Sequence, residues 1–218
     1  MNRCKDLARQ ILAYVQRTEP EKMRRICGFI VAFAVTKKRH LRDERCLQEL
    51  ESILSIQDIR NVQEAEHMPF YCLDVISNFI MEADIAKKSA IQFLSRMDVN
   101  ITELGLAVGR CEKIKNTPMP IAFVVHMRAF MLIWIITLPL VLAKSLGWAT
   151  MLVCVLVAVA VLGIEGMAVE IENPFGYDCN DLPLDVFSEA VAKDVRDVLE
   201  RSQHPDRQLA FDAEPPVW

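Results

Sequence analysis

Glycine is scarce in this chain, with seven residues among 218. The sequence has no Gly-rich phosphate loop, no dinucleotide-binding fingerprint and no Gly-x-Ser-x-Gly nucleophile elbow, and each of these sites needs glycines at fixed positions. The four histidines form neither an HExxH pair nor another catalytic spacing. We therefore predict that the protein is not an enzyme.

Paired cysteines are also missing. None of the seven cysteines forms a CxxC pair, and none stands with a histidine at zinc-binding spacing. An odd count in a chain of this length argues against a disulfide framework. We expect most of the cysteines to be small buried apolar residues, and no cofactor to be required.

A dense basic patch is lacking as well. The run from Thr36 to His40 is typical of a solvated helix end, so nucleic acid is not an expected partner. The polar start MNRCKDLARQ is unlike a secretory signal peptide. Charge is divided along the chain: 19 Lys/Arg and 16 Asp/Glu lie before Pro118, whereas 4 and 13 lie from Glu165 onward.

Two long apolar runs fill the middle of the chain, from Pro120 to Ala143 and from Ala149 to Val169. Each has about the 20 residues that a helix needs to cross a bilayer. The link between them, Lys144 to Gly147, is long enough only for a tight turn, so the two helices must be antiparallel neighbours. A buried hairpin in a soluble core is the alternative, and we favour a membrane crossing.

The flanks of this hairpin predict its orientation. Arg110, Lys113 and Lys115 precede the first run, whereas one lysine occupies the tip. The positive-inside rule then places both ends in the cytoplasm or its topological equivalent.

Polar residues interrupt the apolar runs. Arg128 and Glu165 fall on the same side of an antiparallel hairpin, near His126, so they can pair or line a wet interior. Snorkelling to the interface is the alternative. Pro139 is expected to kink or end the first helix.

The remaining sequence is helical in pattern, and we predict an all-α protein with a helical cytosolic region and a two-helix transmembrane hairpin. The predicted segments are 1–117, 118–170, and 171–218 with an acidic loop, a helix and a tail. Helices are predicted over Glu19–His40, Asp43–Ser55, Met68–Met97, Ile101–Lys115 and Val186–Ser202, with a turn at Asp98–Asn100 and a loop after His204.

A cluster of oxygen-bearing side chains follows the second apolar run directly. Asn173-Pro174 should end the membrane helix, because proline lacks a backbone donor, and Gly176 permits a reversal. Four oxygen-bearing side chains then lie within one loop: Glu172, Asp178, Asn180 and Asp181. Such a set suits a hard cation such as Ca²⁺. It also suits a helix-capping turn, with Asp181 as the cap.

Three stretches resemble the bestrophin family of pentameric anion channels, in its bacterial, algal and plant branch. They are GIEGMAVEIENPFGYDCNDLPLD (Gly163–Asp185), NTPMPIAFVVHMRAFMLIWIITLPLVL (Asn116–Leu142) and KDLARQILAY (Lys5–Tyr14). The resemblance implies an integral membrane subunit in a homo-pentamer, surrounded by lipid and conducting chloride or other small monovalent anions. The membrane is expected to be the plasma membrane or, in a photosynthetic eukaryote, a chloroplast membrane.

Animal members of the family clasp Ca²⁺ in the loop after Asn-Pro-Phe-Gly. By this resemblance Asp178 and Asp181 match the acidic ligands and Asn173 the backbone-contributing one, while Cys179 and Asn180 interrupt the acidic run. Family members also begin with a membrane helix and a pore-neck helix that precede the part matched here, so no neck residue can be named. Two alternatives follow: a non-conducting module that assembles with full-length subunits and modulates them, and a cation-selective channel.

Overall fold

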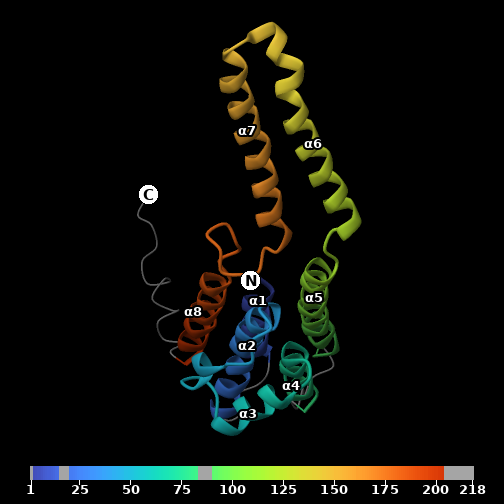
Figure 1. Cartoon of the computed structure of the whole chain (residues 1–218). Helices are drawn as coiled ribbons and strands as arrows, with labels where there is room; N and C mark the ends of the chain where they lie inside the picture. Colours follow the sequence, from blue (N-terminus) through green and yellow to red (C-terminus); the bar gives the residue numbers. More distant parts are fainter. Residues whose placement is uncertain (1, 15–19, 83–89, 204–218) are drawn as a thin grey trace, which may run out of the picture. The chain divides into compact units, whose positions relative to one another are not determined.

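The computed structural model describes residues 2–14, 20–82 and 90–203, and the regular elements in these ranges are helices. The all-α prediction is thus confirmed (Figure 1). In chain order the elements are α1 (Asn2–Tyr14), α2 (Pro20–Leu41), a 3₁₀ turn η1 (Gln48–Leu50), α3 (Ile56–Glu64), α4 (Met68–Glu82), α5 (Ala90–Asn116), α6 (Ile121–Leu146), α7 (Ala149–Glu172) and α8 (Leu184–Gln203).

The chain divides into two compact units. The first, here called the helical body, contains residues 1–112 and 183–218, and the second, the hairpin unit, contains residues 113–182. Helix α8 follows the hairpin in the sequence but belongs to the helical body. The division of the chain into three consecutive segments stays a prediction.

Helix α2 lies at the centre of the helical body, where it packs against α4 and α8. Between Ile26 and Val35 it is apolar on nearly every side, and Phe29 and Ile30 are among its fully buried side chains. A run of this length is too short to cross a bilayer, so neighbouring helices cover it instead. The predicted buried helix over Glu19–His40 agrees with α2.

A buried lysine joins the end of α2 to two other segments. The side chain of Lys38 is 3% exposed, and its Nζ lies 2.6 Å from Glu49 Oε2 and 2.9 Å from Asp185 Oδ1. Asp185, in the first turn of α8, also accepts a hydrogen bond from Arg42 over 2.9 Å. These bonds hold the pKa of Asp185 down at about 2, with those from Lys38 contributing most.

The helix predicted over Asp43–Ser55 is wrong. Asp43 adopts φ 57°, and the Glu44 N–H bonds back to the Arg39 carbonyl over 2.8 Å, which closes the end of α2. Only the short turn η1 follows before α3 begins. The three leucines in this segment are nevertheless buried: Leu47, Leu50 and Leu54. Ile53 is partly buried. The spacing thus identified buried positions but not their backbone conformation.

The turn predicted at Asp98–Asn100 is also wrong, because α5 continues through it. The Asn100 side chain contacts α1 instead of the local backbone: its Oδ1 accepts from Arg3 over 3.0 Å, and its Nδ2 donates to Gln10 over 2.9 Å. Asparagine favours turns when it bonds its own backbone, and here a tertiary partner removes that preference.

Two other predicted segments extend beyond the residues that the structure describes. The helix predicted over Met68–Met97 corresponds, in its described residues, to α4 up to Glu82 and to α5 from Ala90 onward. Residues 83–89, between them, and the predicted loop after His204 lie outside the described residues. The helix predicted over Val186–Ser202 agrees with α8.

Candidate functional site: the apolar hairpin and the turn after it

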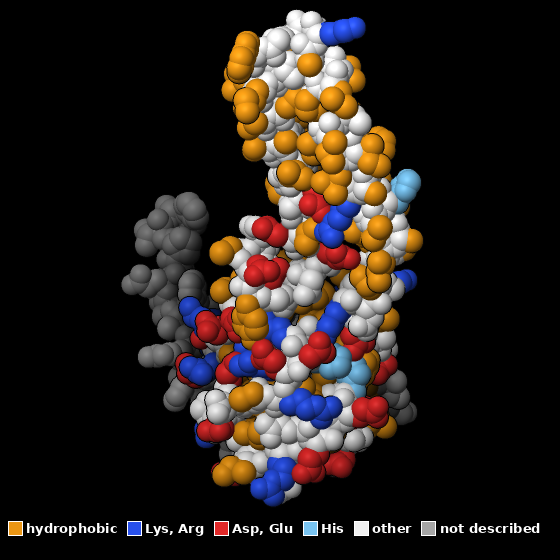
Figure 2. Space-filling view, in the orientation of Figure 1, with side chains coloured by type: hydrophobic (Ala, Val, Ile, Leu, Met, Phe, Trp, Pro, Cys, Tyr) orange, Lys and Arg blue, Asp and Glu red, His pale blue; other side chains and the backbone are white. Residues whose placement is uncertain are grey.

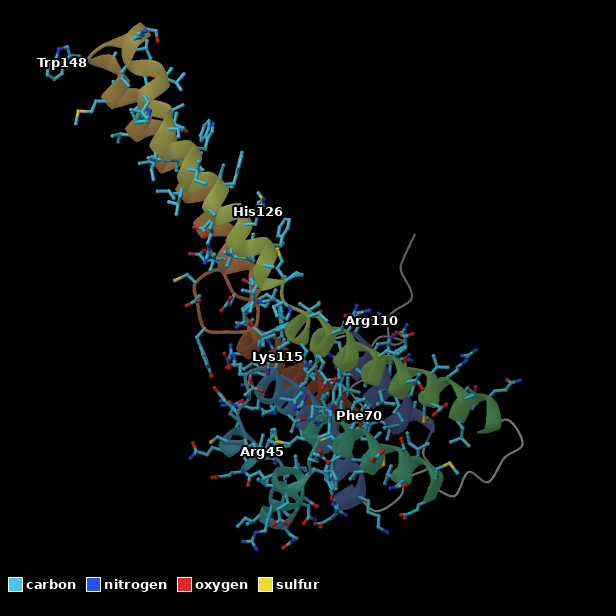
Figure 3. All side chains as sticks on the ribbon, turned by 45° about the vertical axis from the view of Figure 1, so that its right-hand side comes forward. Arg45, Phe70, Arg110, Lys115, His126 and Trp148 are labelled. Carbon is cyan, nitrogen blue, oxygen red and sulfur yellow. The ribbon has the colours of Figure 1, made fainter. Side chains whose placement is uncertain are left out.

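Helices α6 and α7 lie side by side as an antiparallel pair (Figure 1). Within the described residues they are the two helices long and apolar enough to cross a membrane, and no part of their apolar windows is buried. Hydrophobic side chains cover the surface of this pair (Figure 2) and point outward along its whole length (Figure 3). Such a surface needs lipid or further protein to cover it.

The tip of the hairpin turns at a glycine. Gly147 has φ 52° and ψ −124°, a backbone conformation that strains any residue with a Cβ. Thr150 then donates a hydrogen bond from its hydroxyl to the Leu142 carbonyl over 3.2 Å, which ties the two helices together. Trp148, labelled in Figure 3, is 95% exposed at the tip, where an interfacial anchor is expected.

Pro139 lies inside α6 and does not end it, because the helix continues to Leu146. Of the two predicted effects of this proline, ending the helix is therefore wrong, and a kink stays a prediction. Pro139 lines an open apolar hollow of about 600 Å³ near the tip, together with Ala143 of the same helix and Cys154 of α7.

An ion pair links the two helices at their other end. Arg128 Nε donates to Glu165 Oε1 over 2.5 Å, and the side chains are 49% and 26% exposed. The structure therefore shows the pairing, whereas a wet interior and snorkelling to the interface stay predictions. Each residue supplies the charge that the other needs in an apolar setting.

The turn after α7 is closed by its own hydrogen bonds. α7 ends at Glu172, as the Asn-Pro pair predicts. The Leu182 N–H then donates to the Pro174 carbonyl over 3.0 Å. The carboxylate of Asp181 accepts the Asp178 N–H over 2.8 Å, so Asp181 holds this turn together.

Gly176 lies next to the Asp181 carboxylate in this turn. A Cβ on Gly176 would lie 2.7 Å from Asp181 Oδ2, too close for an ordinary contact. The same position lies 4.0 Å from the side-chain nitrogen of Asn173. The absence of a side chain on Gly176 therefore leaves room for the Asp181 carboxylate in the turn.

The three residues implied as Ca²⁺ ligands meet in this turn. Asn173 and Asp181 both lie near Gly176, and the Asp178 N–H donates to the Asp181 carboxylate. Ca²⁺ takes about six to eight oxygen ligands. The described turn supplies part of such a set, and calcium binding stays a prediction.

One cluster of ligand-type side chains had no counterpart in the sequence patterns. His40, His67 and Glu112 meet in the helical body, although 27 and 45 residues separate them along the chain. Motif searches depend on short spacings, so no signal in the sequence could have found this cluster.

Comparisons with known proteins agree with this architecture. Residues 1–197 match the family described as bacterial/fungal bestrophin protein. A voltage-dependent anion channel-forming protein of Nostoc is 34% identical over 205 residues, which cover 93% of this chain and 67% of the relative. A chloroplastic voltage-dependent chloride channel of Arabidopsis thaliana is 27% identical, over 78% of this chain and 41% of the relative.

Solved structures show the same fold. A crystal structure of a mutant bacterial bestrophin homologue from Klebsiella pneumoniae matches with a TM-score of 0.82 and 26% identity, covering 90% of this chain and 73% of that one. This chain spans about two thirds of the length of the curated Nostoc and Synechocystis relatives.

These findings define a class: an all-helical membrane protein of an ion-channel family, and the named relatives support an anion channel. The chain belongs to the bacterial/fungal bestrophin family. That family is one of channels, not of enzymes.

Proposed function

We propose that this chain is a subunit of a membrane channel that conducts chloride and other monovalent anions, assembled as a ring of five. The match over residues 1–197 carries the proposal, because relatives that match most of this chain are named as voltage-dependent anion channel-forming proteins. The number five and the monovalent selectivity come from the family resemblance.

The uncovered hairpin supports assembly in a membrane. No part of the apolar windows of α6 and α7 is buried. Lipid can cover one side of such a pair and neighbouring subunits the other, as in a ring around a pore. The paired Arg128 and Glu165 also fit a wet or protein-lined position better than bare lipid.

Anion flux from liposomes tests this function. The chain is reconstituted by itself, and again with its upstream reading frame restored, and chloride efflux is followed with a chloride-sensitive dye. We expect flux that depends on protein and that passes chloride in preference to potassium. A preference for potassium would favour the cation-selective alternative and overturn the proposed selectivity.

A second candidate is a non-conducting module that assembles with full-length subunits and modulates them. Flux from neither preparation, together with co-purification of this chain with a full-length relative, would favour this candidate. The mass of the detergent-solubilised assembly gives the number of subunits in either case.

A further inference from the structure

Three side chains from distant parts of the sequence meet at one point of the helical body. His40 lies in the last turn of α2, His67 immediately precedes α4, and Glu112 lies in the last two turns of α5. The Nε2 atoms of both histidines face the same carboxylate oxygen, Glu112 Oε1, at 2.6 Å and 2.7 Å. The three ligand atoms all lie within 4.8 Å of one another.

The cluster is reachable from water. The side chains of His40, His67 and Glu112 are 27%, 32% and 25% exposed. Histidine side chains appear in pale blue among carboxylates on this face of the helical body (Figure 2). A small solute can therefore reach the cluster without unfolding any helix.

The two imidazole rings are held in place around the carboxylate. Their centroids lie 4.4 Å apart, and the His67 ring also makes an edge contact with Phe70 at 4.5 Å. Phe70, labelled in Figure 3, lies in the first turn of α4 and rests close to Gly105 of α5. These contacts hold the His67 ring beside the carboxylate of Glu112.

Each of the three side chains offers one ligand atom to the same point. Two imidazole nitrogens and one carboxylate oxygen form a donor set used by Zn²⁺, with a fourth position left for water.

We propose that His40, His67 and Glu112 form a binding site for one divalent transition-metal ion of the Zn²⁺ type. Nitrogen donors select such an ion over Ca²⁺ or Mg²⁺, which prefer oxygen alone. The three residues belong to the helical body, and the proposed function does not use any of them, so the site does not rest on the proposed function.

The three ligand atoms must move slightly apart to bind Zn²⁺. Ligands about 2.0–2.2 Å from a tetrahedral Zn²⁺ lie roughly 3.3 Å from one another, somewhat farther apart than the observed hydrogen bonds. Rotation of half-exposed side chains supplies this opening. Coordination through Nε2 also places the His67 proton on Nδ1, which gives up the long 3.4 Å bond from the Phe70 N–H.

A bound ion would join the end of α2, the start of α4 and the end of α5. Helix α5 leads within a few residues to α6, so the site lies close in the sequence to the start of the membrane hairpin. An ion that binds the folded state alone raises its stability by mass action. Metal binding would therefore be measurable both directly and as a thermal shift.

The test uses the full chain in detergent, stripped with a chelator, with Cys46 and Cys179 changed to serine to remove the exposed thiols. Zn²⁺ is titrated by calorimetry, and Co²⁺ is titrated while its visible absorption is recorded. We expect one ion per chain, a higher melting temperature with Zn²⁺, and Co²⁺ bands of a site with nitrogen and oxygen ligands.

Two variants distinguish the site from the fold. Glu112→Gln keeps a hydrogen-bonding amide but removes the charge. His67→Asn removes the imidazole while keeping a residue favoured at a helix N-cap. We expect each to weaken Zn²⁺ binding at least tenfold, and Glu103→Gln on the same helix to bind as the parent does. Equal affinity in the parent and both variants, or no saturable binding by the parent, would overturn the proposal.

Discussion

At the scale of single residues, Lys38 connects three segments of the helical body. It is the buried cation between two carboxylates from different segments, Glu49 and Asp185. Both carboxylates keep a second basic partner, Arg39 and Arg42 respectively. Removing the lysine therefore weakens the cluster without leaving either acid unpaired.

We expect Lys38→Met to lower the free energy of unfolding by about 1–2 kcal/mol, less than the loss of a fully buried partner, because both carboxylates are well exposed. Thermal melting followed by circular dichroism in detergent measures the loss. Arg24→Met, at an exposed position of the same helix, is the matched control. Equal melting temperatures for the two variants would show that the buried pairs contribute nothing.

Asp185 predicts how stability depends on pH. Bonds from Lys38 and Arg42 lower its pKa from 3.8 to about 2 in the folded state. Its stabilising contribution is therefore complete above the ordinary value and is lost as the pH falls toward the folded one. We expect Asp185→Asn to be less stable than the parent at neutral pH, with a flatter loss of stability between these two values. An unchanged pH profile, relative to the control Glu189→Gln on the same helix, contradicts this.

At the scale of elements, the two hairpin helices depend on each other through Arg128 and Glu165. A double-mutant cycle of Arg128→Gln and Glu165→Gln isolates this pair. We expect a coupling of about 0.5–1.5 kcal/mol, since polar contacts between membrane helices are of this size. Unfolding in mixed detergent gives the four stabilities. Strictly additive losses would mean that the two side chains act independently.

The elements also show what sequence can and cannot predict. The hairpin helices and α2 were predicted closely because each is a long apolar run with proline or charge at its ends. The segment Asp43–Ser55 was wrongly predicted as a helix. Its leucines are spaced as on one face of a helix, but other helices bury them without the segment itself being helical. Asn100 misled because its partners lie on α1, distant in the sequence.

At the scale of the whole molecule, the sequence predicted the family through contiguous motifs but not the metal-type cluster. Asn-Pro-Phe-Gly acts locally, because proline and the close approach of Asp181 to Gly176 shape one turn. The approach of His40 to His67 instead depends on how α2, α4 and α5 pack. Contacts of that kind become visible only when the helices are placed in space.

Orientation in the membrane is the last prediction. The basic residues before α6 predict that both ends of the hairpin lie in the cytoplasm or its topological equivalent and that its tip lies on the other side. In intact right-side-out vesicles, we expect a membrane-impermeant maleimide to label Ser145→Cys at the tip at once. The exposed Cys46 and Cys179 should react only after permeabilisation.

Ser202→Cys, on α8, is the matched control for the cytoplasmic side, and its labelling in intact vesicles would reverse the orientation. Labelling of all these positions from one side would mean that the hairpin does not cross the bilayer. That result would overturn the assignment of α6 and α7 as membrane-spanning helices.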